Sequence, residues 1–358
     1  MSDIKFTRFH KVYLIVVLLF ILAIGLYDVR YKLTNRQVAN SSESSTSQVV
    51  SSSQSETVNS SEAASSSTDD SEATNASSSE DSQTTNLLAV AETITTPVAV
   101  NATTDQEASD MAAYSADYAG DIQSYTVAEI ANSVATQLGI SQIDAINQLV
   151  SALPKDVDLT ASQYQMVNKL NPLATEPVMT FAYTANGKPF NAEIEPAYTG
   201  LIEAATQAGY TMTVISGHRT IAYQAQNVQN AYNIYLSQGY SEAEALELTN
   251  SYYAPAEASE HSTGLAFDLL GTEWTSIGGS LDEGYASQPS AQWLADNAQD
   301  YGFILRYPDG KDQITGYLFE PWHYRYVGIE AAQYIHQYDL TLEEFYALVN
   351  FRDAVNQS

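Results

Sequence analysis

Hydrophobic and polar residues are distributed very unevenly along this chain. An apolar run without charge occupies residues 12–27, with YLIVVLLFILAIG at its centre and basic residues on either side. The run is slightly shorter than the ~20 residues that span a bilayer, but flanking Lys and Arg side chains can extend it by snorkelling. We therefore expect residues 1–36 to form a cytoplasmic tail and an uncleaved transmembrane anchor. A cleaved signal peptide is the rival interpretation, which the following LYDVRYK disfavours because it lacks a small-residue cleavage site.

Polar low-complexity sequence follows the apolar run. Residues 37–120 are dominated by Ser, Thr, Asn, Ala, Glu and Asp, and no Lys or Arg occurs between Arg36 and Lys155. Such a segment buries too little apolar surface to offset the entropy lost on ordering. The composition therefore predicts a disordered, self-repelling spacer that carries an outward-facing domain across a thick matrix. A linker without that reach is the alternative.

Amphipathic patterns begin again after the spacer. In residues 121–163, Thr126 and Glu129 match a capping box before a helical stretch, and Ser141 opens a second stretch that Pro154 ends. We expect a small helical segment here, without chemistry of its own, that packs on the following domain or connects to it.

The remaining residues, 164–358, mix strand and helix patterns. Strand-like alternation occurs at 210–215, 263–270 and 316–327. Helical patterns occur at 221–238, after the capping pair Ser241 and Glu244, and after the capping pair Thr341 and Glu344. Because these elements do not alternate in regular βαβ units, we predict an α+β fold, a single domain with a small antiparallel sheet flanked by helices.

Charge and composition exclude several classes of function. The formal net charge of -29 disfavours nucleic acid as a partner, because phosphate binding draws its affinity from Lys and Arg. The chain has no cysteine, so any metal must be held by His, Asp or Glu. Of the histidines, His10 precedes the apolar run and His336 lies in a late helical stretch, where we expect a structural role. Three histidines remain, each in a local cluster of polar residues.

His261 and Asp268 form the first cluster, within SEHSTGLAFD at 259–268. Gly264 lets the backbone turn where a side chain would obstruct it. Asp268 stands in an apolar strand, where burying a carboxylate is costly unless a partner compensates. A metal ion beside His261 is one such partner, and a loop cap or an Arg pair is the alternative.

Glu320 and His323 form the second cluster, EPWH. Positions three apart on a regular strand point to opposite faces, so these side chains converge only if the chain bends, and Pro321 is suited to interrupt the strand there. His323 would then bind a metal with Glu320 beside it, as a metallopeptidase requires. An aromatic strand with a surface Glu is the alternative.

Arg219 belongs to the third cluster, SGHR, between a predicted strand and a predicted helix. An Arg in this place can bind a substrate carboxylate with two hydrogen bonds or stabilise an oxyanion. A surface ion pair is the alternative.

Together, SGHR, SEHSTGLAFD and EPWH, in this order over 216–323, resemble the VanY-like D-alanyl-D-alanine carboxypeptidases, a family that includes L,D-carboxypeptidases of Gram-positive cell walls. MVNKLNP at 166–172 resembles the family's entry to its catalytic domain, so the resemblance covers residues 164–339.

The resemblance implies roles for particular residues. It implies a Zn²⁺ ion held by His261, Asp268 and His323. It implies that Glu320 is the catalytic base and later acid. It implies a substrate site that includes Arg219, Ser259, Gln224 and Trp322, with Arg219 also acting in catalysis. His218 departs from the family, in which Tyr is common, so we expect His218 to pack beside the site rather than to bind metal.

The implied function is zinc-dependent removal of the C-terminal D-alanine from peptidoglycan stem peptides, from pentapeptides, tetrapeptides or both. The rivals are a non-catalytic module that binds wall peptides, and a D,D-dipeptidase or peptidoglycan endopeptidase of the same fold. The intact ligand set and base disfavour a pure binding module. With the anchor and spacer, we expect a single-pass protein of the cell membrane whose catalytic domain lies on the extracellular, cell-wall side.

Overall fold

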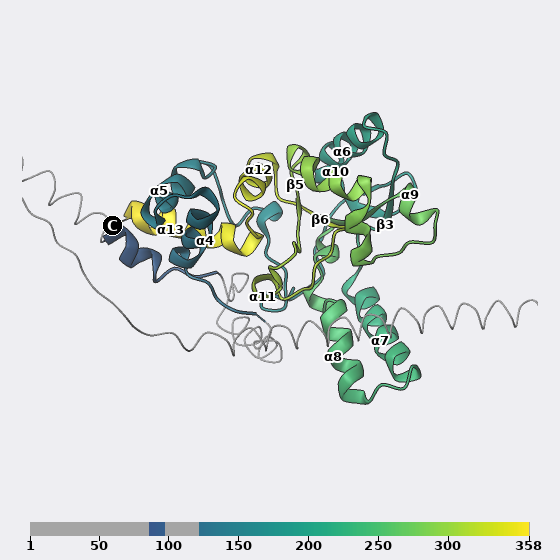
Figure 1. Ribbon diagram of the computed structural model, residues 1–358. Coiled ribbons are helices and arrows are strands. Elements are labelled where there is room, and N and C mark those ends of the chain that lie inside the picture. The colour runs from purple at the N-terminus through teal and green to yellow at the C-terminus, as the bar shows by residue number, and fades with distance from the viewer. Residues whose placement is uncertain (1–85, 97–121, 358) are drawn as a thin grey trace, which may run out of the picture. The chain divides into compact units, whose positions relative to one another are not determined.

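Helices and short strands make up the described part of the chain (Figure 1). The computed structural model describes residues 86–96 and 122–357, all within one unit, Asp70–Ser358. The longer helices are α4 (Val127–Leu138), α5 (Gln142–Ala152), α6 (Glu195–Gln207), α7 (Ile221–Ser237), α8 (Glu242–Tyr252), α10 (Pro289–Asn297), α12 (Ile329–Gln337) and α13 (Leu342–Gln357). Two single-turn helices are α9 (Thr272–Thr275) and α11 (Asp312–Thr315). The strands are β1 (Phe181–Tyr183), β2 (Pro189–Asn191), β3 (Met212–Ser216), β4 (Ala266–Gly271), β5 (Phe303–Leu305) and β6 (His323–Tyr326).

Helices α4, α5, α12 and α13 share one apolar core. Val127, Ile146 and Phe345 are fully buried in it. The capping box of Thr126 and Glu129 forms with both reciprocal hydrogen bonds, and the Ser141 side chain caps α5. The predicted helical segment therefore exists, and it packs against α13 of the domain that follows it.

Residues 86–96 also belong to this core, although they fall within the range expected for the spacer. Residues 86–91 are helical, Ala91 is fully buried, and Thr95 pairs with Thr126 in an antiparallel bridge. Their sequence, NLLAVAETITT, offers apolar surface to bury, unlike the Ser-rich stretch before it. The spacer prediction therefore does not hold for these residues.

The other N-terminal predictions lie outside the described residues. These are the anchor in residues 1–36 and the rest of the spacer, residues 37–85 and 97–121. Within 86–96 and 122–357, no helix has the length and apolarity needed to cross a membrane.

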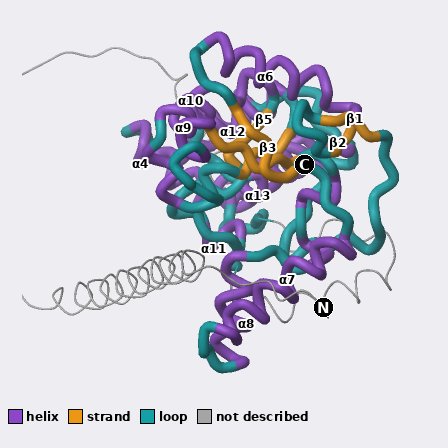
Figure 2. Tube along the Cα trace, turned by 90° about the vertical axis from the view of Figure 1, so that its right-hand side faces the viewer, coloured by secondary structure: helices purple, strands orange, loops and turns teal. Residues whose placement is uncertain are grey.

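The four-stranded sheet positions the chemistry. Its order is β3-β4-β6-β5, with every neighbouring pair antiparallel, and its strands lie side by side among helices in Figure 2. Side chains alternate across β4, so Phe267 and Leu269 enter an apolar core that also includes side chains of α6 and α10, while Asp268 points to the opposite face. Burying a side chain such as Phe267 stabilises the fold by ~1.5–3 kcal/mol. Together with the two-stranded sheet of β1 and β2, this arrangement confirms the α+β class.

A helical hairpin connects β3 to β4. Helices α7 and α8 pack against each other, and both views show them side by side (Figures 1 and 2). The side chain of Thr220 caps α7, and Ser241 with Glu244 forms the predicted capping box of α8. Immediately after this hairpin the chain enters the segment that carries His261.

The strand predicted at 316–327 is much shorter in the structure. Only His323–Tyr326 pairs as β6. Gly316 ends α11 with a φ of 77°, and the backbone N–H of His323 closes a turn on the carbonyl of Glu320. The prediction is therefore wrong for 316–322, because Pro321 has no N–H for a ladder and the chain turns there.

Candidate active site

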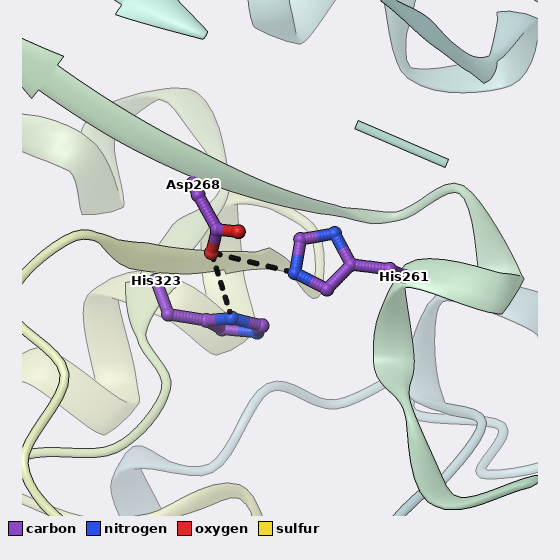
Figure 3. A group of neighbouring side chains, drawn as sticks. All are labelled: His261, Asp268 and His323. Carbon is purple, nitrogen blue, oxygen red and sulfur yellow. Dashed lines mark ion pairs between the residues drawn. The ribbon is translucent and has the colours of Figure 1, made fainter. Parts of the chain in front are cut away.

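Three side chains from separate segments meet on one face of the sheet (Figure 3). His261 comes from a 3-10 turn, Glu260–Thr263, while Asp268 and His323 are direct partners in the register of β4 and β6. Nε2 of His261 and Nδ1 of His323 each lie 3.3 Å from Oδ1 of Asp268. The three residues are 1, 3 and 4% exposed. The structure thus brings together the three residues that the sequence predicted as ligands.

Two glycines place His261. Gly264 ends the 3-10 turn with a φ of 67°, so the predicted need for glycine is met where the chain turns into β4. Nδ1 of His261 lies 2.7 Å from the carbonyl oxygen of Gly217. Because a carbonyl only accepts, Nδ1 carries the proton, and the lone pair of Nε2 faces Asp268.

The donor atoms fit a zinc ion. In a tetrahedral site with bonds of about 2.0–2.1 Å, neighbouring donors stand about 3.3–3.4 Å apart. The two nitrogen–oxygen separations of 3.3 Å match that spacing, and the three donors all lie within 4.8 Å of one another. Nε2 of His261 is buried without a hydrogen-bond partner among the described residues. The geometry therefore suits a cation better than a hydrogen-bonded cluster.

The two imidazoles differ in charge. Burial, together with the charge of Arg219, lowers the pKa of His261 to about 4, which leaves it neutral near pH 7, as a metal ligand must be. At His323 burial also opposes protonation, but hydrogen bonds to Asp268 and Glu260 outweigh it and raise the pKa to about 9. A metal ion must therefore compete with a proton at His323.

Glu320 stands beside the cluster. Its Oε2 lies 3.5 Å from Nδ1 of His323, so the bend predicted at Pro321 does bring the two side chains together. Burial raises the pKa of Glu320 to about 7; the charge of His323 opposes this shift and that of Asp268 adds to it. In the described part of the chain, no Lys or Arg forms an ion pair with Glu320. A carboxylate with such a pKa can accept and return a proton near neutral pH.

Arg219 reaches the same cluster from the loop after β3. Its Nη1 lies 3.3 Å from Oδ2 of Asp268, so Asp268 faces two imidazoles through one oxygen and an arginine through the other. Asp268 can therefore bind a metal through one oxygen and pair with Arg219 through the other, so these two predicted roles are compatible. Nε of Arg219 is buried and finds no acceptor in residues 86–96 or 122–357, which leaves a donor for a bound molecule.

Ser259 and Gln224 are both 2% exposed. The side-chain amide of Gln224 donates to the carbonyl of Ala254, but its Oε1 and the Oγ of Ser259 have no partner among the residues described. Buried polar atoms without partners are costly, so both atoms suit contacts with a ligand. Trp322 packs in an apolar cluster with Leu270 and Tyr285. The substrate-binding roles of these residues stay predictions.

The other two histidines of the described residues, His218 and His336, lie outside the cluster. The ring of His218 packs 4.8 Å from that of Phe181, and its Nε2 lies 3.5 Å from a carboxylate oxygen of Glu176. This is the packing role expected for it. His336 is exposed on α12.

Sequence reasoning missed a buried charge network behind the cluster. Glu260, Arg306, Arg325 and Glu343 are at most 2% exposed and are linked by ion pairs. Arg306 and Arg325 stand in otherwise apolar or aromatic strand sequences, FILRY and HYRYV. The chain has only 14 Lys and Arg, so two arginines within apolar or aromatic strand sequences could have indicated buried ion pairs.

The fold and the site together suit a hydrolase, with a candidate metal site of two His and one Asp and a nearby Glu on an α+β scaffold. A family model described as VanY, D-alanyl-D-alanine carboxypeptidase, matches residues 188–329, a range that contains every predicted site residue. The chain therefore contains a domain of this VanY family.

Relatives cover this domain rather than the whole chain. A D-alanyl-D-alanine carboxypeptidase of Enterococcus faecalis is 37% identical over 180 residues, which are 50% of this chain and 64% of that relative, less than two thirds of its length. A vancomycin-resistance D,D-pentapeptidase VanY, solved as a mutant with Zn(II), is 34% identical, covers 52% of this chain and 99% of its own, and has a TM-score of 0.47. The LdcB LD-carboxypeptidase is 32% identical, covers 54% and 92%, and has a TM-score of 0.44.

Proposed function

We propose that this protein is a zinc-dependent carboxypeptidase that removes the C-terminal D-alanine from peptidoglycan stem peptides, acting on D,D ends, L,D ends or both. One observation carries the proposal: Nε2 of His261 and Nδ1 of His323 converge on Oδ1 of Asp268, with the Glu320 carboxylate alongside. The family match and the Zn(II) and D-alanyl-D-alanine named with related structures support it.

A zinc ion held by His261, Asp268 and His323 would supply Lewis acidity toward the scissile carbonyl and the attacking water. Glu320 accepts a proton from the attacking water and passes it to the nitrogen of the departing D-alanine. Its raised pKa suits both tasks, because a base and its conjugate acid are then both accessible near neutrality. His261, Asp268 and His323 act as ligands and exchange no proton with the substrate.

Arg219 binds the negative charge of the substrate. Its guanidinium is held by Asp268 through Nη1 and keeps Nε free of partners within the described residues, so it can donate to the terminal carboxylate or to the oxyanion. Ser259 and Gln224 add an unpartnered hydroxyl and an unpartnered amide oxygen for the polar groups of the peptide end.

We also propose that the apolar run at 12–27 anchors the protein as a single-pass membrane protein, with the catalytic domain on the cell-wall side. The polar residues that separate this run from the catalytic domain support the proposal, since peptidoglycan lies beyond the membrane surface. Protease accessibility of the domain on intact cells tests this location.

Mass spectrometry of defined peptides tests the activity. The purified full chain, with zinc or with a chelator, is incubated with a stem pentapeptide and a stem tetrapeptide. We expect zinc-dependent loss of a single alanine from at least one of them, and Glu320→Gln serves as the matched inactive control. Release of a dipeptide would indicate a dipeptidase or endopeptidase, and no release by the zinc-loaded protein would overturn the proposal.

A further inference from the structure

Glu260 lies directly before the predicted metal ligand His261 in sequence, and its carboxylate contacts the other imidazole of the cluster, that of His323. Its side chain is fully buried, and Oε2 lies 3.4 Å from Nε2 of His323. Oε1 accepts hydrogen bonds from Nε of Arg306 and Nη1 of Arg325, each at 2.8 Å. Both oxygens therefore have partners.

The contact between Glu260 and His323 determines how the imidazole is used. A carboxylate held by two arginines is anionic and only accepts hydrogen bonds, so Nε2 of His323 must donate. The lone pair then resides on Nδ1, the atom that lies 3.3 Å from Asp268 and 3.5 Å from Glu320. The opposite tautomer would place a proton on the atom that faces the cluster.

We propose that Glu260 is a positioning residue that holds His323 in the tautomer and orientation whose Nδ1 binds the metal, an inference that rests on the proposed zinc site. Outer hydrogen-bond partners of this kind typically change metal affinity by about 10- to 100-fold when removed. His261 has an equivalent partner in the carbonyl of Gly217, so the two imidazoles are held in opposite tautomers by different means.

The two glutamates near His323 thus have separate tasks. Glu260 pairs with two buried arginines. If it turned to the metal, Arg325 would lose its carboxylate partner and Arg306 would lose one of its two. Glu320 has no such partner in the part of the chain that the structure describes, and its side chain is 19% exposed. Pairing with arginine therefore distinguishes Glu260, the positioning residue, from Glu320, the proposed base.

Segments outside the family match complete the network. Arg306 donates to both oxygens of Glu343, in the first turn of α13, and Asn168 donates to the same carboxylate. Arg325 donates to the carbonyl oxygens of Gln163 and Gln165. Because Glu343, Gln163 and Gln165 lie outside 188–329, the network that holds His323 extends beyond the family match.

Zinc affinity of two matched variants tests the proposal. In Glu260→Gln the amide oxygen can satisfy the arginines only by turning its NH₂ group toward Nε2 of His323, where two donors would oppose each other. Glu343→Gln removes the same charge from the same arginine cluster without touching His323, and is the control. Both variants should lose thermal stability, and only folded protein, checked by circular dichroism, is titrated.

We expect Glu260→Gln to raise the zinc Kd by about 10- to 100-fold, measured by competition with a chromophoric chelator, and Glu343→Gln to change it by less than about 3-fold. An equal effect of the two variants, or no effect of either, would overturn the inference. A wild-type chain that binds no zinc would instead refute the zinc site itself.

A measurement on wild-type protein covers the case in which Glu260→Gln does not fold. In zinc-loaded protein with ¹⁵N-labelled histidine, two-bond ¹H–¹⁵N correlations report which ring nitrogen carries the proton. We expect the proton on Nε2 in His323 and on Nδ1 in His261. A proton on Nδ1 of His323 would overturn the positioning role even if the peptidase is active.

Discussion

Replacing Gly217 with alanine should perturb the candidate metal site without changing any of its proposed ligands. A Cβ built at Gly217 would lie 2.3 Å from the carbonyl oxygen of Pro189, a backbone atom that cannot turn aside. Relieving that overlap to ordinary van der Waals contact requires the two backbones to separate by about 1 Å. The same Pro189 oxygen accepts a hydrogen bond from the N–H of His218, so the substitution should strain this hydrogen bond as well.

The displacement is transmitted directly to His261, because the carbonyl oxygen of Gly217 is the acceptor of its Nδ1 proton at 2.7 Å. A misplacement of about 1 Å in a catalytic arrangement costs about 100-fold in rate. We therefore expect Gly217→Ala to lower kcat/KM by about 100-fold, which corresponds to about 2.7 kcal/mol of transition-state stabilisation. Weaker zinc binding should accompany the loss.

Steady-state release of D-alanine, with zinc content measured in parallel, checks this prediction. Gly139→Ala is the control: Gly139 has a φ of 67° and open space around it, so alanine there strains the backbone between α4 and α5 without a collision. That variant should lose some stability and keep its kcat/KM. Wild-type kcat/KM and zinc content in Gly217→Ala would refute the reasoning that this close approach sets the position of His261.

Other predictions concern the reacting groups. Glu320→Gln should lower kcat by about 100- to 10,000-fold while zinc content, read by elemental analysis, stays at the wild-type level. Because burial raises the pKa of Glu320, kcat/KM should fall as the pH is lowered through that pKa, since the protonated carboxyl accepts no proton; a flat acid limb would contradict its role as base. His261→Ala should lose the metal, and retention of stoichiometric zinc would remove it from the ligand set. Arg219→Lys should lower kcat/KM by about 10-fold or more, because lysine cannot reproduce the two-pronged geometry; unchanged kinetics would reduce Arg219 to a partner of Asp268. A chelator should abolish activity and added zinc restore it, whereas a β-lactam should leave it unchanged, because no serine is acylated.

Much of the fold was accessible from local sequence. The capping boxes of α4 and α8 and the N-cap of α5 depend on residues three apart, and each forms as predicted. The strand at 316–327 was predicted too long because aromatic alternation continues through a segment in which Gly316 and Pro321 turn the chain. Residues 86–96 were assigned to the spacer together with the polar sequence around them. Their burial depends on helices that follow much later in the chain.

The sequence by itself determined which residue types were available for chemistry. With no cysteine, any metal had to be held by His, Asp or Glu, and His261, Asp268 and His323 stood in local polar clusters that could supply such ligands. The clusters also carried the family resemblance, which the family match confirmed. Short sequence motifs were enough for these conclusions, because each motif depends only on residues close together in the chain.

Only the tertiary structure determined the separate roles of those residues. The register that sets Asp268 opposite His323 depends on pairing between two distant strands, β4 and β6. The tasks of Glu260 and Glu320 likewise depend on which of them meets buried arginines, and no local pattern encodes that. Charge and hydrogen bonding act across space, so the same residue type becomes a fixed anion in one place and a proton acceptor in another.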